Sequence, residues 1–279
     1  MLRGIALGAI CAMLLAGGVA RAQEGITVTG NPDRPERKEI LKALTRGIAR
    51  KEEDGQLARF DDNLCIVVSG FSGPYNDVVA GRMADDAISA GLHVEKPGCR
   101  PNVVLLITDN VSQELRYLGR DGGPAASVGL LDKDLRDLAE GPGPAYVVTM
   151  TELRSRDGNH LGGGRPPVMI VNDSSIINPP TRHDIVGVLV ALESSAAMGK
   201  SLRQLADYAA LRAMARLKDS TMTMGEPSIL TLFQDKAPVA ELSAYDRAYL
   251  KGLYRGSAAM TGRAQMHEIV AQAVRSTAP

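Results

Sequence analysis

Residues 64–108, LCIVVSGFSGPYNDVVAGRMADDAISAGLHVEKPGCRPNVVLLIT, decide the fold. The apolar, β-branched run at 64–71 predicts a β-strand. A helical pattern of apolar residues follows over 75–90, and Gly91 supplies the residue that ends the helix. The run VVLLIT at 103–108 predicts a second strand, which is apolar on both faces and therefore central. Strand, helix and strand in this order predict one βαβ unit with two parallel strands.

Further elements are expected on both sides of this unit. Helical spacing predicts a helix over 36–53, and a second, short helix is expected around 132–140. Two strands are predicted at 145–153 and 167–171. The Gly-rich segment 154–166 is expected to join these two strands as a hairpin.

From Thr181 onward the sequence predicts helices. Three capping boxes mark expected helix starts, and a last helix is expected over 262–274. The boxes are Thr181-x-x-Asp184, Ser201-x-x-Gln204 and Ser243-x-x-Asp246. The predicted fold class is α/β (α+β): a single domain with a mixed sheet of four or five strands, helices packed on it and a helical C-terminal half.

The first 22 residues have the pattern of a secretory signal peptide. Arg3 gives a positive start, residues 4–20 carry no charge, and Ala20-Arg21-Ala22 forms an exit for signal peptidase. We therefore expect a signal peptide at 1–22, an extended leader at 23–35 and one domain at 36–279. The rest of the chain has no apolar run of membrane length, so we expect a soluble mature protein, periplasmic or secreted, without a transmembrane segment.

Composition excludes several classes of protein. The 279 residues are 44% hydrophobic and 23% charged, as in ordinary globular chains, which excludes wholesale disorder. Lys+Arg and Asp+Glu both number 32, so there is no basic excess that would favour a nucleic-acid partner. Aromatic residues are only 4%, with no Trp, which leaves few rings for stacking on bases or sugars.

Removal of the signal peptide leaves two cysteines, Cys65 and Cys99. An even pair in an exported chain predicts a disulfide. A bridge closing a loop of about 35 residues stabilises a fold by about 3–4 kcal/mol in the chain-entropy model. Two separate buried thiols are the alternative interpretation.

No complete catalytic or metal-binding motif is present. A zinc-peptidase helix needs two histidines four residues apart with a glutamate between them, but Ala271 stands in the second position after His267, and Gly187 after His183. We therefore assign no catalytic residue, metal ligand or cofactor. The alternative interpretation is a hydrolase, including a metal-dependent one with a degenerate zincin-like site. Its candidate residues are His160, His183, Asp184 and Glu193.

The favoured interpretation is a non-catalytic binding or envelope-associated protein. Its predicted binding residues are Arg182 and His183, at one expected helix start, and Asp207 and Arg212, on the next helix. The mixed charges of that second helix predict a solvated face on which Asp207 forms local ion pairs with Arg203 and Arg212. The expected partner is an unknown protein or a component of the cell envelope.

Five segments together resemble an uncharacterised family of exported proteins from alphaproteobacteria, a domain of unknown function. They are LCIVVSGFSGPY, PGCRPNVVLLIT, TRHDIVGVLVALE, GKSLRQLADYAALRAMA and LSAYDRAYLKGLY, within residues 64–254. The resemblance implies no activity and no catalytic residues. In layout the chain is also distantly similar to zincins, and that similarity would place the expected helix 181–197 where zincins bind metal, without their metal motif.

Overall fold

Four strands form one mixed sheet, in the order β1-β2-β4-β3, in a computed structural model of the chain. The structure describes residues 35–120, 135, 143–161, 179–218, 226–234 and 239–277. These residues all belong to one unit, 32–279. The predicted signal peptide, and the leader apart from its last residue, lie outside the described residues.

The βαβ unit is present as predicted. Strand β1 (Ile66–Ser69) is followed by helix α2 (Tyr75–Ala90) and strand β2 (Val103–Thr108), and the two strands pair in parallel. Gly91 ends α2 in the left-handed conformation, with φ 98°, and its N–H donates to the carbonyl of Ile88 at 3.0 Å. The β-branched run of β2 alternates between buried and half-buried residues, as a strand inside a sheet should.

The helix predicted from Thr181 is wrong, because this segment is strand β4 (Thr181–Glu193). β4 lies between β2, to which it is parallel, and β3 (Ala145–Ser155), to which it is antiparallel. Its central residues 188–192 are VLVAL, and all are buried. A short apolar run of this kind fits a strand covered on both faces as well as a buried helix, and the pairing available on both sides decides for the strand.

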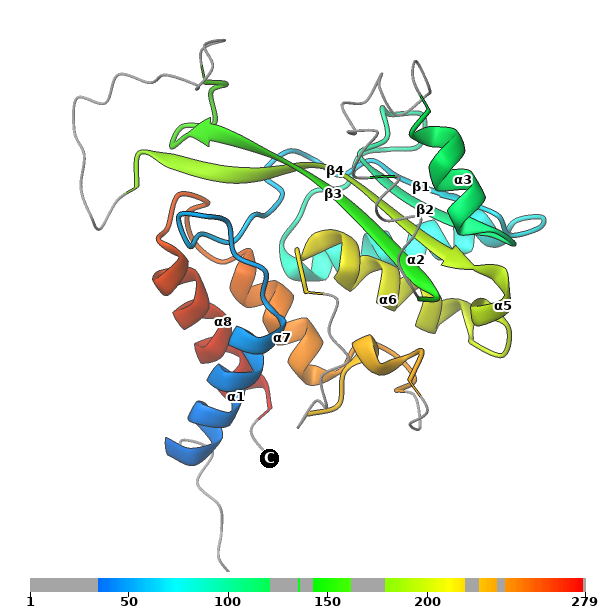
Figure 1. Ribbon diagram of the computed structural model, residues 1–279. Coiled ribbons are helices and arrows are strands. Elements are labelled where there is room, and N and C mark those ends of the chain that lie inside the picture. Colours follow the sequence, from blue (N-terminus) through cyan, green and yellow to red (C-terminus); the bar gives the residue numbers. More distant parts are fainter. Residues whose placement is uncertain are drawn as a thin grey trace, which may run out of the picture. The chain divides into compact units, whose positions relative to one another are not determined.

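The strands β3 and β4 continue beyond β2 as a two-stranded ribbon (Figure 1). β2 pairs only with 188–193 of β4. Residues 181–187 pair along their length with β3, and on the other side β4 makes an isolated parallel bridge between Asp184 and Arg59. A β-bulge between Met150 and Thr151 lies opposite Gly187 at the start of the ribbon. A side chain at Gly187 would meet the flexible end of Met150, which would have to shift to make room for it.

Seven α-helices and one short 3-10 helix complete the described part of the chain. The capping boxes predicted at Ser201 and Ser243 both form, and the last helix begins at Gly262 as predicted. Besides α2 the helices are α1 (Pro35–Ile48), α3 (Val111–Leu118), α5 (Ser194–Ala197), α6 (Leu202–Met214), η2 (Ile229–Thr231), α7 (Ala244–Leu253) and α8 (Gly262–Ser276). The predicted fold class is confirmed: a mixed four-stranded sheet with helices packed around it and a helical C-terminal half.

Helices cover both faces of the sheet, and the larger core lies on one of them. α2 and α6 lie against one face, and α3 lies against the other (Figure 1). The larger core joins residues such as Val68, Leu105 and Val190 of the sheet to α1, α2, α6, α7 and α8. The smaller core contains Leu115 of α3 and Leu189 of β4. The alternation of side chains along β4 thus contributes to both cores.

Cys65 and Cys99 form the predicted disulfide, with their Cα atoms 5.9 Å apart. Cys65 directly precedes β1, and Cys99 precedes β2, so the bridge ties the same ends of two neighbouring strands. Two other predicted elements are not tested, because the strand at 167–171, and the helix at 132–140 apart from Leu135, lie outside the described residues.

Candidate functional site

The first two predicted binding residues lie on the part of β4 that belongs to the ribbon. Arg182 is only 8% exposed, and its Nη2 donates to Asp61 at 2.6 Å and to Asp184 at 2.9 Å. The Nε2 atom of His183 lies 3.1 Å from Oδ2 of Asp54, in the loop that follows α1. Arg182 is therefore engaged in a buried ion pair, whereas His183 reaches the neighbouring loop.

Arg154 extends the Arg182 ion pairs from β3. Its Nη1 lies 3.4 Å from Oδ2 of Asp184 and 3.2 Å from Oδ2 of Asp62, and its Nε donates to Glu152 at 2.9 Å. Burial raises the pKa of Asp184, and the positive charges of Arg182 and Arg154 oppose this effect. Because Arg182 and Arg154 pair with Asp61 and Asp62, these ion pairs hold the loop around Asp61 to the ribbon. Removing one partner of such a network would leave a buried charge uncompensated.

Asp207, a predicted binding residue on α6, is fully buried rather than solvated. Its Oδ1 accepts from Nε of Arg82 on α2 at 2.6 Å, and its Oδ2 accepts from the backbone N–H of Leu242 at 2.6 Å. The expected local ion pair with Arg203 is absent from the ion pairs of the described residues, because Arg203 pairs with Glu241 instead. The prediction of a solvated face is wrong at this position.

Arg212, the fourth predicted binding residue, is 7% exposed and donates to the carbonyl of Lys218 at 3.5 Å. α6 contacts α2, α7, η2 and the sheet, so most of its circumference is covered. The charge pattern of α6 suggests a surface position for Arg212, but packing of other elements around the helix buries it. The four predicted residues therefore belong to separate networks and do not form one site.

The residues of the alternative metal site are also spread out. His160 is bonded to Glu152 and is largely exposed, and Glu193 accepts from the backbone N–H of Val111 at 3.1 Å. His183 and Glu193 lie ten positions apart on one strand, which separates them by roughly 30 Å. Within the described residues, no group of three or more His, Cys, Asp or Glu side chains is placed to hold a metal ion.

A groove of about 730 Å³ lies between α1 and α8. Its volume is in the range of small-molecule binding sites. Residues of α1, of the loop that follows it and of the first half of α8 form its walls. They are Lys38, Glu39, Lys42, Arg46, Lys51, Asp54, Gly55, Thr261, Gly262, Arg263, Met266, His267 and Val270.

Close packing around Gly262 fixes the end of this groove. A side chain at Gly262 would collide with the carbonyl of Gly55, so only glycine lets the loop after α1 lie against the first turn of α8. The buried amide of Gln265 then holds the same loop: its Oε1 accepts from the N–H of Leu57 at 2.7 Å, and its Nε2 donates to the carbonyl of Leu57 at 3.0 Å. The backbone of the loop is therefore held directly against the first turn of α8.

The basic residues of α1 share one side of the helix. Lys38, Lys42 and Arg46 recur at intervals of four, which places them along one face about 6 Å apart along the helix axis. The opposite side of α1 carries the apolar residues that enter the core, namely Leu41, Leu44 and Ile48. Burial of that apolar side forces the basic side toward the groove.

The groove carries an excess of positive charge. Five lysines and arginines line it, against the carboxylates of Glu39 and Asp54. Glu39 is bonded to Lys42 at 3.0 Å, and Asp54 accepts from the backbone N–H of Gln56 at 2.9 Å and contacts His183. Within the described residues no ion-pair partner is present for four of the cations, Lys38, Arg46, Lys51 and Arg263.

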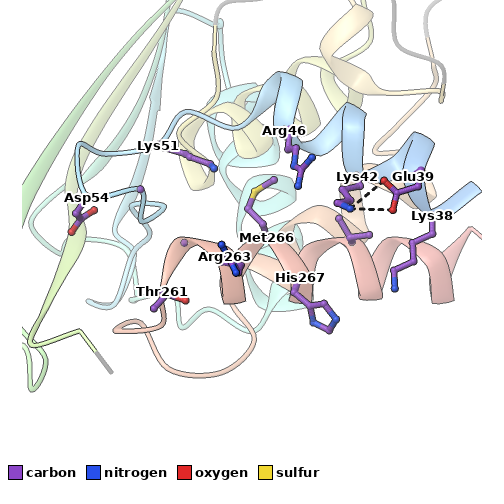
Figure 2. Close-up of a pocket in the computed structure, with 13 residues that line it drawn as sticks. Lys38, Glu39, Lys42, Arg46, Lys51, Asp54, Thr261, Arg263, Met266 and His267 are labelled. Atoms are coloured by element: carbon purple, nitrogen blue, oxygen red, sulfur yellow. Dashed lines mark hydrogen bonds and ion pairs between the residues drawn. The ribbon is translucent and has the colours of Figure 1, made fainter. Parts of the chain in front are cut away.

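These cations come from both walls and from the loop between them. Figure 2 shows Arg46 and Lys51 pointing into the space that Met266 enters from α8, with Lys51 and Lys38 toward opposite ends of the groove. The groove also includes the start of α8, where the helix dipole adds partial positive charge. Ammonium and guanidinium groups bind phosphate and carboxylate oxygens by charge-assisted hydrogen bonds, so this arrangement is suited to anion binding.

Sequence reasoning missed this groove, although α1 carried a signal. The i, i+4, i+8 spacing of Lys38, Lys42 and Arg46 is visible in the sequence. Its partner wall, α8, begins more than 200 residues later. Only the fold brings the two walls together.

Comparisons with known proteins find no match to this chain among protein-family models, curated proteins or solved structures. Of the helices in the described residues, none has both the length and the apolar character needed to cross a membrane.

Proposed function

We propose that this is an extracytoplasmic binding protein that holds an anionic ligand in the groove between α1 and α8. The observation that carries the proposal is the gathering of four cationic side chains without acidic partners among the described residues. Like charges held together repel one another, so an anion that neutralises them lowers the free energy of the folded protein. Binding without chemical conversion of the ligand is the function that this lining supports best.

The proposed location rests on two features. The sequence predicts a signal peptide at 1–22, and the Cys65–Cys99 pair is joined by a disulfide. Structural disulfides persist in oxidising compartments and are rare in the reducing cytosol. Both features support a periplasmic or secreted protein whose ligand belongs to the cell envelope or its surroundings.

Inorganic pyrophosphate is a suitable first probe for calorimetric titration at low salt. We expect binding that weakens as salt is added, because exposed ion pairs are screened. The variant Arg46→Glu/Arg263→Glu should lose this binding. The variant Lys96→Glu/Arg100→Glu changes the charge equally, at exposed positions outside the groove, and should bind as the wild type does.

Two outcomes would overturn the proposal. One is that the Arg46→Glu/Arg263→Glu protein binds the probe as tightly as the wild type. The other is that the wild type binds neither pyrophosphate nor long-chain polyphosphate at low salt. Circular dichroism of each variant establishes that it is folded before titration.

A further inference from the structure

We infer that the ligand of the α1–α8 groove is an unbranched phosphate chain that lies lengthwise along the groove. This inference rests on the proposed function and adds the chemical class and the orientation of the ligand. It follows from how the cations are spaced and from what else lines the groove.

The cations form an extended row rather than a single cluster. From Lys38 to Arg46 the row covers about 12 Å of the α1 axis. Lys51 continues it in the loop after α1, and Arg263 faces it from α8. Figure 2 shows this row from Lys38 at one end to Lys51 at the other. A compact anion such as inorganic phosphate would contact neighbouring cations and leave the others unpaired, whereas a chain of charges would pair with the whole row.

The lining disfavours other extended anions. Single-stranded nucleic acids and many sugars are held by stacking on aromatic rings, and the described residues that line the groove include no aromatic ring other than the imidazole of His267. Peptides are commonly held by large side chains that fill apolar pockets, and among the described lining residues the large apolar ones are Met266 and Val270. A phosphate chain needs neither feature, since each unit offers oxygen acceptors to lysine and arginine.

Chain length gives such a ligand a gain in affinity that a short anion lacks. Once one phosphate is bound, the next is held near the following cation at a high effective concentration. Each neutralised cation also releases counterions from the chain, so the affinity becomes strongly dependent on salt. Pyrophosphate and long-chain polyphosphate should therefore differ in both affinity and salt dependence.

The decisive experiment compares two single variants at opposite ends of the row, Lys38→Ala and Lys51→Ala, with Lys96→Ala as the control outside the groove. Affinity for long-chain inorganic polyphosphate is measured by titration over a range of salt concentrations. We expect each end variant to weaken binding about fivefold and to reduce the slope of log K against log salt by about one. The control should match the wild type.

The same variants are titrated with pyrophosphate, which should sense at most one of the two ends. We expect wild-type protein to bind the long chain at least about tenfold more tightly than pyrophosphate. Equal affinity for the two probes, or a long chain that is insensitive to either end variant, would refute the chain-like ligand and leave anion binding intact. Failure of both probes to bind wild-type protein refutes the proposed function itself.

Discussion

The carboxyl group of Asp86 should make the folded protein less stable as the pH rises from about 4 to about 7. Asp86 on α2 and Asp207 on α6 share one cation, Arg82, which lies 3.5 Å from Asp86 and 2.6 Å from Asp207. Asp86 is only 4% exposed, and its Oδ2 has no hydrogen-bond partner among the described residues. Burial and the negative charge of Asp207 raise the pKa of Asp86 from 3.8 to about 7.

The size and sign of the effect follow from this pKa. The folded protein keeps a proton on Asp86 at pH values where the unfolded chain has released it. The raised pKa therefore contributes its full share to the free energy of unfolding below about pH 4, and this contribution is lost as the pH rises from about 4 to about 7. A shift of about three pKa units corresponds to at most about 4 kcal/mol of unfolding free energy. Asparagine has the shape of the protonated side chain and cannot ionise. We therefore expect Asp86→Asn to unfold with nearly wild-type free energy at pH 4 and to be more stable than wild type by about 2–4 kcal/mol at pH 8.

Urea denaturation at pH 4, 6 and 8, with the disulfide intact, measures this difference. Asp85→Asn is the matched control, because Asp85 is the exposed neighbour on the same helix. It should change stability by less than about 0.5 kcal/mol at every pH. If Asp86→Asn shifts the unfolding midpoint equally at pH 4 and pH 8, or destabilises the protein at pH 8, Asp86 does not carry a raised pKa and the reasoning is refuted.

Two further predictions concern the disulfide and the groove. Cys65→Ala/Cys99→Ala should lose about 3–4 kcal/mol of unfolding free energy, measured by urea denaturation, and an unchanged midpoint would show that the bridge does not constrain the unfolded chain. Gly262→Ala should destabilise by about 1–3 kcal/mol and weaken polyphosphate binding, because the new methyl group displaces the loop at Gly55. Its control is Gly81→Ala, where the new methyl group would meet open space on a helix. We expect the control to gain up to about 1 kcal/mol of unfolding free energy. Equal changes in the two variants would contradict the close contact at Gly262.

The elements that the sequence predicted well are those in which local signals and tertiary packing agree. α2 combines apolar spacing with a glycine at its end, and the structure gives the predicted bounds, 75–90. β2 is short, β-branched and flanked by breaks, and its bounds also match. β4 is different, since Thr181 and Asp184 imitate a capping box while the following residues suit a buried strand. Its partner β3 lies 26 positions upstream, and a pairing over that distance leaves no periodic trace in either segment.

The same limit applies to the charged residues of α6. Asp207 and Arg203 are four positions apart, which suggests a local pair on a solvated face. The actual partner of Asp207 is Arg82, 125 positions away. Helical spacing describes which residues share a face, but it does not reveal whether a second helix covers that face.

The net charge of the chain does not reveal how folding distributes its positive and negative side chains. The chain has as many acidic as basic residues, which argues against a protein that attracts polyanions over its whole surface. Binding depends on the charges within a few ångströms of the ligand, because salt screens exposed charges beyond about 8–10 Å. In the groove, Glu39 and Asp54 are already engaged, whereas four cations lack acidic partners among the described residues, namely Lys38, Arg46, Lys51 and Arg263. A neutral protein can therefore hold a strongly charged ligand when folding separates its positive side chains from its negative ones.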